Sequence, residues 1–140
     1  MEDFAARDGR YVTAPQSTHR AYPFYMSARD AARVGLLFLN GGKWRDRQIV
    51  PAAWIKESGT TYTAVTNRID RGYGYLWWTL QPEQWGADAI MADGNGGQKI
   101  AVIPAQRLVA VVNVDQSQNP KGVPTRAFFE LVRKLVPAMP

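Results

Sequence analysis

The sequence contains no cysteine, one histidine and no long apolar run. The absence of cysteine excludes disulfide scaffolds and thiolate metal sites, and it leaves the redox compartment and the localisation undetermined. Because His19 stands alone among dispersed carboxylates, we expect no metal site and no cofactor. No apolar run approaches the roughly 18 residues that cross a bilayer, and the N-terminus is acidic. We therefore expect no membrane partner and no signal peptide.

The sequence also lacks the nucleophile motifs of common hydrolases. There is no Gly-x-Ser-x-Gly elbow, and no serine is followed three residues later by lysine. We interpret Ser27 as a helix cap, and we interpret the other serines as loop residues rather than nucleophiles: Ser17, Ser58 and Ser117. The carboxylates show no paired spacing on a common element, which gives no support to glycosidase chemistry.

The length and composition are those of one globular domain, with 140 residues and 46% hydrophobic content. A net charge of +5 is compatible with binding to nucleic acid, but the basic residues are scattered along the chain. The one basic cluster, residues 43–47, is interrupted by Asp46. We therefore expect no nucleic-acid partner.

The first half of the chain predicts loops and short helices. Residues 1–26 show no sustained period and are expected to form an extended loop. Ser27, with Asp30 three residues later, predicts the start of a helix that ends at 40–42, Asn-Gly-Gly. Pro51 predicts the first position of a second helix. We expect Trp54 and Ile55 on the inner side of that helix, and residues 58–71 form a polar connector or a functional loop.

The second half predicts strands and a terminal helix. Strand patterns occur at 73–80, more weakly at 87–92, and at 99–103 and 108–115, with a tight turn at 104–107. A helix is expected from about residue 125, with one apolar stripe. The fold class is therefore α+β, with an antiparallel sheet of three to five strands and the C-terminal helix on one face. We divide the chain into a loop and helical segment, 1–71, and a sheet and helix segment, 72–140.

One strand indicates that the domain is incomplete. Residues 108–112, Leu-Val-Ala-Val-Val, are apolar without alternation, as in strands that are buried on both faces. The terminal helix can cover one face, and the first helix is a candidate for the other. Because that first helix lies far away in the sequence, we expect that a covering layer is missing from the chain.

The segment 93–98, Asp-Gly-Asn-Gly-Gly-Gln, leads directly into the strand pattern at 99–103. Two interpretations fit this segment equally well. It can be a hairpin turn with glycines at positive φ, or a site where the backbone N–H of Gln98 stabilises an oxyanion in acyl transfer. Trp77 and Trp78 are expected on opposite faces of a strand, one in the core and the other against a cleft or under the helix.

Four segments resemble the serine β-lactamase and penicillin-binding-protein superfamily, and they occur in the order of that family. Residues 93–104 resemble its third motif, in which Asn95, Gly96 and Gly97 take the three motif positions. The other segments are similar to a helix, a hairpin with its following helix, and an aromatic strand of class C-like β-lactamases, related esterases and 6-aminohexanoate-dimer-hydrolase-like enzymes: 22–37, 42–54 and 72–78.

The resemblance implies a partial β-lactamase/transpeptidase-like fold and acyl transfer on a small ester, amide or β-lactam. On this view Gln98 donates its N–H to the oxyanion, Asn95, Gly96 and Gly97 bind substrate, and Trp77 lines the site. The family's Ser-x-x-Lys and Tyr-x-Asn do not occur, so the chain is expected to be an inactive C-terminal part of a longer hydrolase. Asn95 replaces the usual lysine or histidine, which favours a substrate without a carboxylate.

A second hypothesis is a binding or interaction module that kept this scaffold and lost catalysis. Its partner would be the missing N-terminal segment or a second copy of the chain, docked on the exposed sheet.

Overall fold

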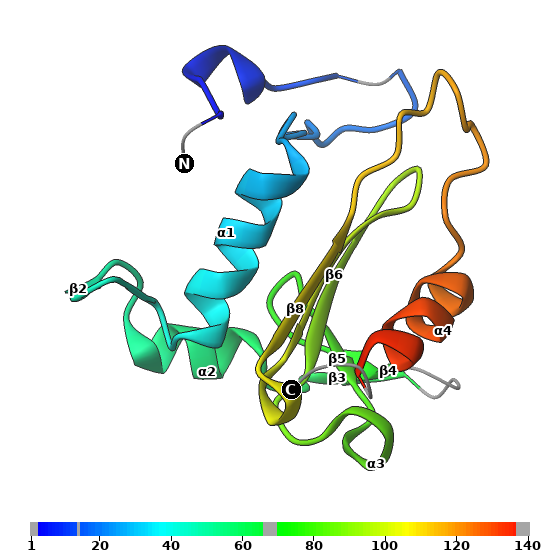
Figure 1. Ribbon diagram of the computed structural model, residues 1–140. Coiled ribbons are helices and arrows are strands. Elements are labelled where there is room, and N and C mark those ends of the chain that lie inside the picture. Colours follow the sequence, from blue (N-terminus) through cyan, green and yellow to red (C-terminus); the bar gives the residue numbers. More distant parts are fainter. Residues whose placement is uncertain (1–2, 14, 66–69, 137–140) are drawn as a thin grey trace.

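A six-stranded antiparallel sheet lies between two helices in the computed structural model, which describes residues 3–13, 15–65 and 70–136 (Figure 1). The sheet order is β3-β4-β5-β6-β7-β8, so that strands adjacent in sequence are adjacent in space. The strands of this sheet are Thr63–Ala64, Asp70–Tyr73, Trp78–Leu80, Ile90–Gly94, Gln98–Ile103 and Leu108–Val112. The helices are α1 Ala28–Leu39, α2 Ala52–Ser58, α3 Pro82–Trp85 and α4 Thr125–Leu135, and a small hairpin pairs β1 Lys43–Trp44 with β2 Arg47–Gln48. This confirms the α+β class, the antiparallel sheet and the C-terminal helix, with one strand more than the upper number expected.

Helix α1 begins and ends where the sequence predicts. The Ser27 hydroxyl oxygen accepts a hydrogen bond from the Asp30 backbone N–H at 3.1 Å, which satisfies one of the free donors of the first turn. The helix ends at Asn40, followed by Gly41 and Gly42 at positive φ. Pro51 is the N-cap of α2 rather than its first residue.

Each face of the sheet carries its own apolar cluster. On one face, Phe128, Phe129 and Val132 of α4 pack on the sheet side chains Met91 and Ala101. On the other face, Trp77, Ile90 and Val102 pack with Phe38 and Leu39 of α1. Figure 1 shows the strands β6 to β8 between these two helices. The alternation along β6 and β7 therefore sends neighbouring residues into different layers.

The expectation of an uncovered face on residues 108–112 is wrong. Helix α1 lies over β7 and β8, and it approaches so closely that a Cβ added at Gly35 would meet Val109 Cγ1 at 2.5 Å and Ile100 Cγ2 at 3.0 Å. Only glycine allows the helix to lie this near the strands. Helix α1 therefore forms the second covering layer, which the sequence analysis expected to be missing.

The predicted strand 73–80 is wrong, because two antiparallel strands, β4 and β5, share that stretch. The chain reverses between them: Leu76 has a φ of +63°, and the Gly74 N–H donates to the Trp77 carbonyl at 2.8 Å. The aromatic composition of residues 73–80 is typical of a strand over its whole length and gives no sign of the turn at Leu76. Trp54 is also not on the inner side of α2; it is 48% exposed and packs on Tyr75 at a ring distance of 5.5 Å.

The N-terminal loop is attached to the start of α1. Within residues 3–13 and 15–26 there are one short 3₁₀ turn at Ala6–Asp8 and two isolated bridges, in place of a uniform extended loop. Asp30, fully buried, accepts from the Asp3 N–H at 3.0 Å and from Arg33 Nη1 at 2.7 Å. The Ser27 hydroxyl donates to Asp3 at 2.6 Å. The expected boundary at residue 71 falls within β4 and remains a prediction.

Candidate functional site

The glycine-rich segment forms the hairpin between β6 and β7. Gly94 pairs with Gln98, and Asn95, Gly96 and Gly97 make the connection. The Gly97 N–H donates to the Gly94 carbonyl at 3.2 Å. Gly96 has positive φ and Asn95 does not, which is the sign pattern of a type II turn. The segment is therefore a hairpin, and its exposed tip residue is Asn95.

The glycines also allow a close backbone approach from the loop between β8 and α4. A Cβ added at Gly96 would meet the Gln116 side chain, and one at Gly97 would meet the Val123 N at 2.4 Å. From the other side, a Cβ at Gly122 would meet the Gly96 carbonyl oxygen at 2.3 Å. One side of the hairpin is thus filled by protein. This contact accounts for the number of glycines, which exceeds what a turn requires.

The side chain of Gln98 fixes the hairpin from the strand side. Its Nε2 donates to the Val114 carbonyl, and its Oε1 accepts from the Val114 N–H, both at 2.8 Å. These two hydrogen bonds imitate the pairing of two strands and continue the β7–β8 ladder beyond Val112. A backbone held on both sides in this way has the preorganisation that an N–H donor needs to stabilise charge.

An ion pair that the sequence analysis missed lies at the base of the hairpin. Lys99, only 3% exposed, donates to Asp93 Oδ1 at 2.8 Å, and Asp93 Oδ2 accepts from the Thr125 hydroxyl at 2.8 Å. Asp93 and Lys99 are paired across the two strands, and Thr125 begins α4. Lys99 is therefore a buried strand residue with a charged partner. Its signal in the sequence was the position directly opposite an aspartate across a short hairpin.

Trp77 lies apart from the hairpin tip. Its ring is 8% exposed and packs on Phe38 at a centroid distance of 4.5 Å, on the face that α1 covers. It shares a cluster with Ile90, which stands four positions before Gly94 on β6, a separation of roughly 13 Å. Trp78 belongs to the opposite layer, as expected. The structure thus brings together Asn95, Gly96, Gly97 and Gln98 but not Trp77.

Each of the four serines has a hydrogen bond that does not involve a basic side chain. Ser17 Oγ donates to the His19 carbonyl at 3.0 Å, so the His19 imidazole takes no part. Ser27 is the α1 cap, and the buried Ser58 donates to the Ile55 carbonyl. Ser117 donates to Asp115 at 2.7 Å, and this bond leads the causes that lower the pKa of Asp115. Within the described residues, no serine hydroxyl is hydrogen-bonded to a lysine, histidine or tyrosine side chain; Ser27 and Ser117 donate to the aspartates Asp3 and Asp115.

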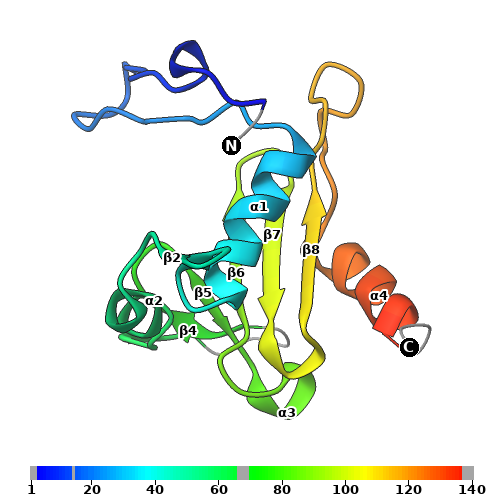
Figure 2. The ribbon, with the colours of Figure 1, turned by 60° about the vertical axis from the view of Figure 1, so that its left-hand side comes forward.

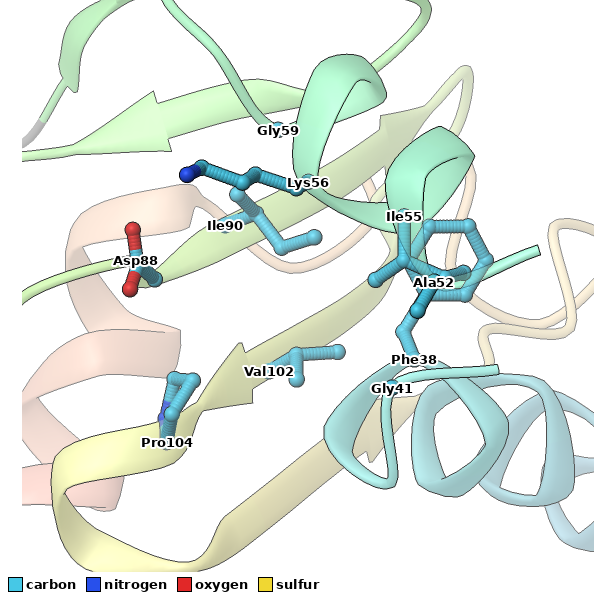
Figure 3. Close-up of a pocket in the computed structure, with 10 residues that line it drawn as sticks. All are labelled: Phe38, Gly41, Ala52, Ile55, Lys56, Gly59, Asp88, Ile90, Val102 and Pro104. Carbon is cyan, nitrogen blue, oxygen red and sulfur yellow. The ribbon is translucent and has the colours of Figure 1, made fainter. Parts of the chain in front are cut away.

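A pocket of about 280 Å³ lies on the α1 face, between α1, α2 and the sheet (Figure 3). Its floor includes Ile90 and Val102, and Lys56 and Asp88 extend toward each other at one end. The remaining lining is apolar or glycine: Phe38, Gly41, Ala52, Ile55, Gly59 and Pro104. The volume and the apolar floor suit a small amphipathic molecule, but none of these lining residues is a nucleophile. The glycine hairpin does not line this pocket.

No cluster of three or more histidine, aspartate or glutamate side chains is placed to bind a metal ion in the ranges 3–13, 15–65 and 70–136. Among the helices of the same residues, none has the length and apolar character of a membrane span.

Comparison with solved structures shows which fold this is. The chain is similar to a protein from Bacillus anthracis that is provisionally named a 6-aminohexanoate-dimer hydrolase, with a TM-score of 0.54 and 20% sequence identity. The match covers 81% of this chain and 30% of that one, so the chain spans less than a third of the hydrolase it resembles. The likeness shows that this chain has the fold of part of that protein.

The sequence itself has no such match. No protein-family model matches the chain, and no curated protein matches it.

Proposed function

We propose that the chain is the C-terminal part of a β-lactamase-like serine hydrolase and forms the substrate and oxyanion wall of an acyl-transfer site. The observation that carries this is the rigid β6–β7 hairpin, in which Gln98 is bonded twice to Val114 and Asn95 is exposed at the tip. The fold likeness to a hydrolase supports the same assignment at a coarser level.

The roles follow from the chemistry of the groups on the hairpin. The N–H of Gln98 would stabilise the negative charge that develops on a carbonyl oxygen, because a fixed backbone dipole does not need to reorient during the reaction. Asn95, Gly96 and Gly97 would contact the substrate, through one neutral amide and the backbone. With no cation at Asn95, a neutral ester or amide fits better than a substrate with a carboxylate. The nucleophile and its base would come from sequence outside these 140 residues.

The proposal makes a direct test possible on the 140-residue chain. Incubation with nitrocefin or p-nitrophenyl butyrate is expected to give no burst and no acyl-enzyme, since the chain has no Ser-x-x-Lys and no Tyr-x-Asn. A burst would contradict the assignment of the nucleophile to another segment. The wall itself is tested by NMR, titrating butylphosphonate as a mimic of the tetrahedral intermediate. Shifts are expected at the amides of 95–98.

Matched variants make the NMR test specific. Asn95→Ala is expected to weaken the phosphonate response, whereas Gln118→Ala, an exposed amide on the neighbouring loop, should leave it unchanged. Absence of any shift at 95–98 would refute the oxyanion wall.

A binding module without catalysis is the second candidate function. The close approach of Gly96 and Gly97 to their neighbours favours this second function, because it gives the two glycines a structural role that needs no substrate. These neighbours are Gln116, Gly122 and Val123. If butylphosphonate leaves the hairpin unaffected while the fold is intact, this second function gains support over the first.

A further inference from the structure

A charged residue interrupts the apolar row that β7 presents to α4. Lys99, Ala101 and Ile103 alternate along the strand and are 3%, 0% and 0% exposed. Ala101 and Ile103 belong to the cluster that α4 covers, and Met91 of β6 stands opposite Ala101. In the next row of the same face, Asp93 stands opposite Lys99. The ladder therefore changes from an apolar pair to an ionic pair at the last row before the hairpin.

Fold stability alone does not account for this ionic pair. An apolar pair of similar size is often as stable or more stable, because a lysine and an aspartate lose hydration when they are buried. The ionic pair adds discrimination, since a buried cation is stable only where its anion stands opposite it. Asp93 and Lys99 thus favour one alignment of β6 against β7.

The other residues of the hairpin specify this alignment weakly. The three glycines of the segment 93–98 have no side chain that could fix a pairing, and strands rich in glycine slip more easily. Both faces of β7 are apolar over residues 100–103, so burial distinguishes little between neighbouring registers. A slip by one residue, in contrast, places Lys99 opposite Ala92 or Gly94. That register leaves a buried ammonium without an anion.

Asp93 also connects the hairpin to α4. Its Oδ1 accepts a hydrogen bond from Lys99 and its Oδ2 accepts one from the Thr125 hydroxyl, both at 2.8 Å. Thr125 is the first residue of α4, and the segment that precedes it returns past the glycines, as the orange loop beyond β8 in Figure 2. Because each oxygen bonds a different element, the carboxylate holds β6, β7 and α4 in one arrangement.

We propose that Asp93 is a positioning residue for the oxyanion wall, and that it acts through its bonds to Lys99 and Thr125. These three groups form a register lock, which keeps the Gln98 N–H at the site. Gln98 directly precedes Lys99, so a shift of the ion pair shifts the donor with it. A donor that stabilises developing charge must be held to within about 0.5 Å. The role toward Gln98 rests on the proposed hydrolase function, whereas the lock itself can be measured without a ligand.

The double variant Asp93→Leu with Lys99→Met tests the register lock, because it exchanges the ionic pair for an apolar pair at constant net charge. The urea midpoint should stay within about 0.5 M of the wild-type value. The amide signals of residues 94–98 should nevertheless broaden or double in the NMR spectrum of the free chain, since more than one register is then populated. The affinity for butylphosphonate should fall by about fivefold.

The link to α4 is tested separately. Thr125→Val removes only the hydroxyl and should weaken phosphonate binding by about two- to threefold, whereas Thr125→Ser should retain the wild-type affinity. This comparison decides the question if the double variant does not fold. The matched control is Arg126→Gln with Glu130→Gln, which removes a solvent-exposed ion pair of α4 at constant net charge. It should leave the hairpin signals and the affinity unchanged.

The two readouts distinguish the register lock from the proposed function. If the apolar double variant keeps one sharp set of hairpin signals and the wild-type affinity, the lock is wrong while the oxyanion wall stands. If the wild-type chain shows no phosphonate shift but the variant populates a second register, the oxyanion wall is wrong, and the role toward Gln98 falls with it. A loss of affinity that only follows a loss of stability would also overturn the lock, because a purely structural role predicts that result.

Discussion

The buried ion pair at the base of the hairpin predicts an asymmetric response to mutation. Asp93→Ala leaves the ammonium of Lys99, 3% exposed, without its anion, and a buried charge deprived of its partner costs about 3–4 kcal/mol. Lys99→Met keeps a chain of similar length in the core. It leaves Asp93, whose side chain is 27% exposed and still bonded to Thr125, so the cost should be only about 1–2 kcal/mol.

Urea unfolding followed by tryptophan fluorescence measures both values. With an m-value of about 2 kcal/mol/M, the midpoint should fall by about 1.5–2 M for Asp93→Ala and by about 0.5–1 M for Lys99→Met. The double variant should resemble Lys99→Met, because removing the lysine removes the unpaired charge. Lys134→Met, at an exposed position of α4, is the control for losing one positive charge. The reasoning fails if Lys99→Met destabilises as much as Asp93→Ala.

Three further predictions concern close packing and one raised pKa. Gly35→Ala should push α1 from the sheet and cost about 1–3 kcal/mol in urea unfolding, and an unchanged midpoint would contradict the close approach. Gly97→Ala, at a φ of +85° against the backbone of Val123, should destabilise by a similar amount and broaden the NMR signals of the hairpin. Tyr62→Phe should lower the pKa of Tyr75, which is raised to about 12 first by the hydrogen bond of the Tyr75 hydroxyl with Tyr62 and then by desolvation and nearby charge; absorbance at alkaline pH measures this pKa. Because the folded pKa of Tyr75 lies above its ordinary value of 10, its stabilising contribution is complete below pH 10 and is lost as the pH rises toward 12.

The sequence predicted those elements whose signals are local. Ser27 with Asp30 marked the start of α1, and the glycines at 94–97 marked a reversal, because capping and positive φ depend on a few adjacent atoms. The turn at Leu76 was missed, since nothing in an aromatic run shows that a leucine takes positive φ. The two-residue strand β3 was missed because so short a strand has no period.

The candidate site was predicted in part, for a similar reason. The hairpin residues 95–98 are contiguous, so the sequence grouped them correctly. Trp77 was grouped with them by resemblance, whereas its distance from the tip depends on where β5 joins the sheet. The ion pair of Lys99 was missed because its anion, Asp93, is held by Thr125 of α4, whose position on the sheet is a tertiary property.

The position of Gly35 within α1, against β7 and β8, has a consequence for the order in which the molecule is made. Synthesis produces α1 long before β7 and β8, the strands that it covers. The meander β6–β7–β8, whose connections are short, can form by local contacts, whereas α1 meets β7 and β8 through contacts that are distant in the sequence and can dock only once both strands have been made. Until then Ile100 and Val109 face solvent on a nascent chain, so the interval before docking is when this protein is most exposed to aggregation. Gly35 then admits the helix without requiring the finished strands to move.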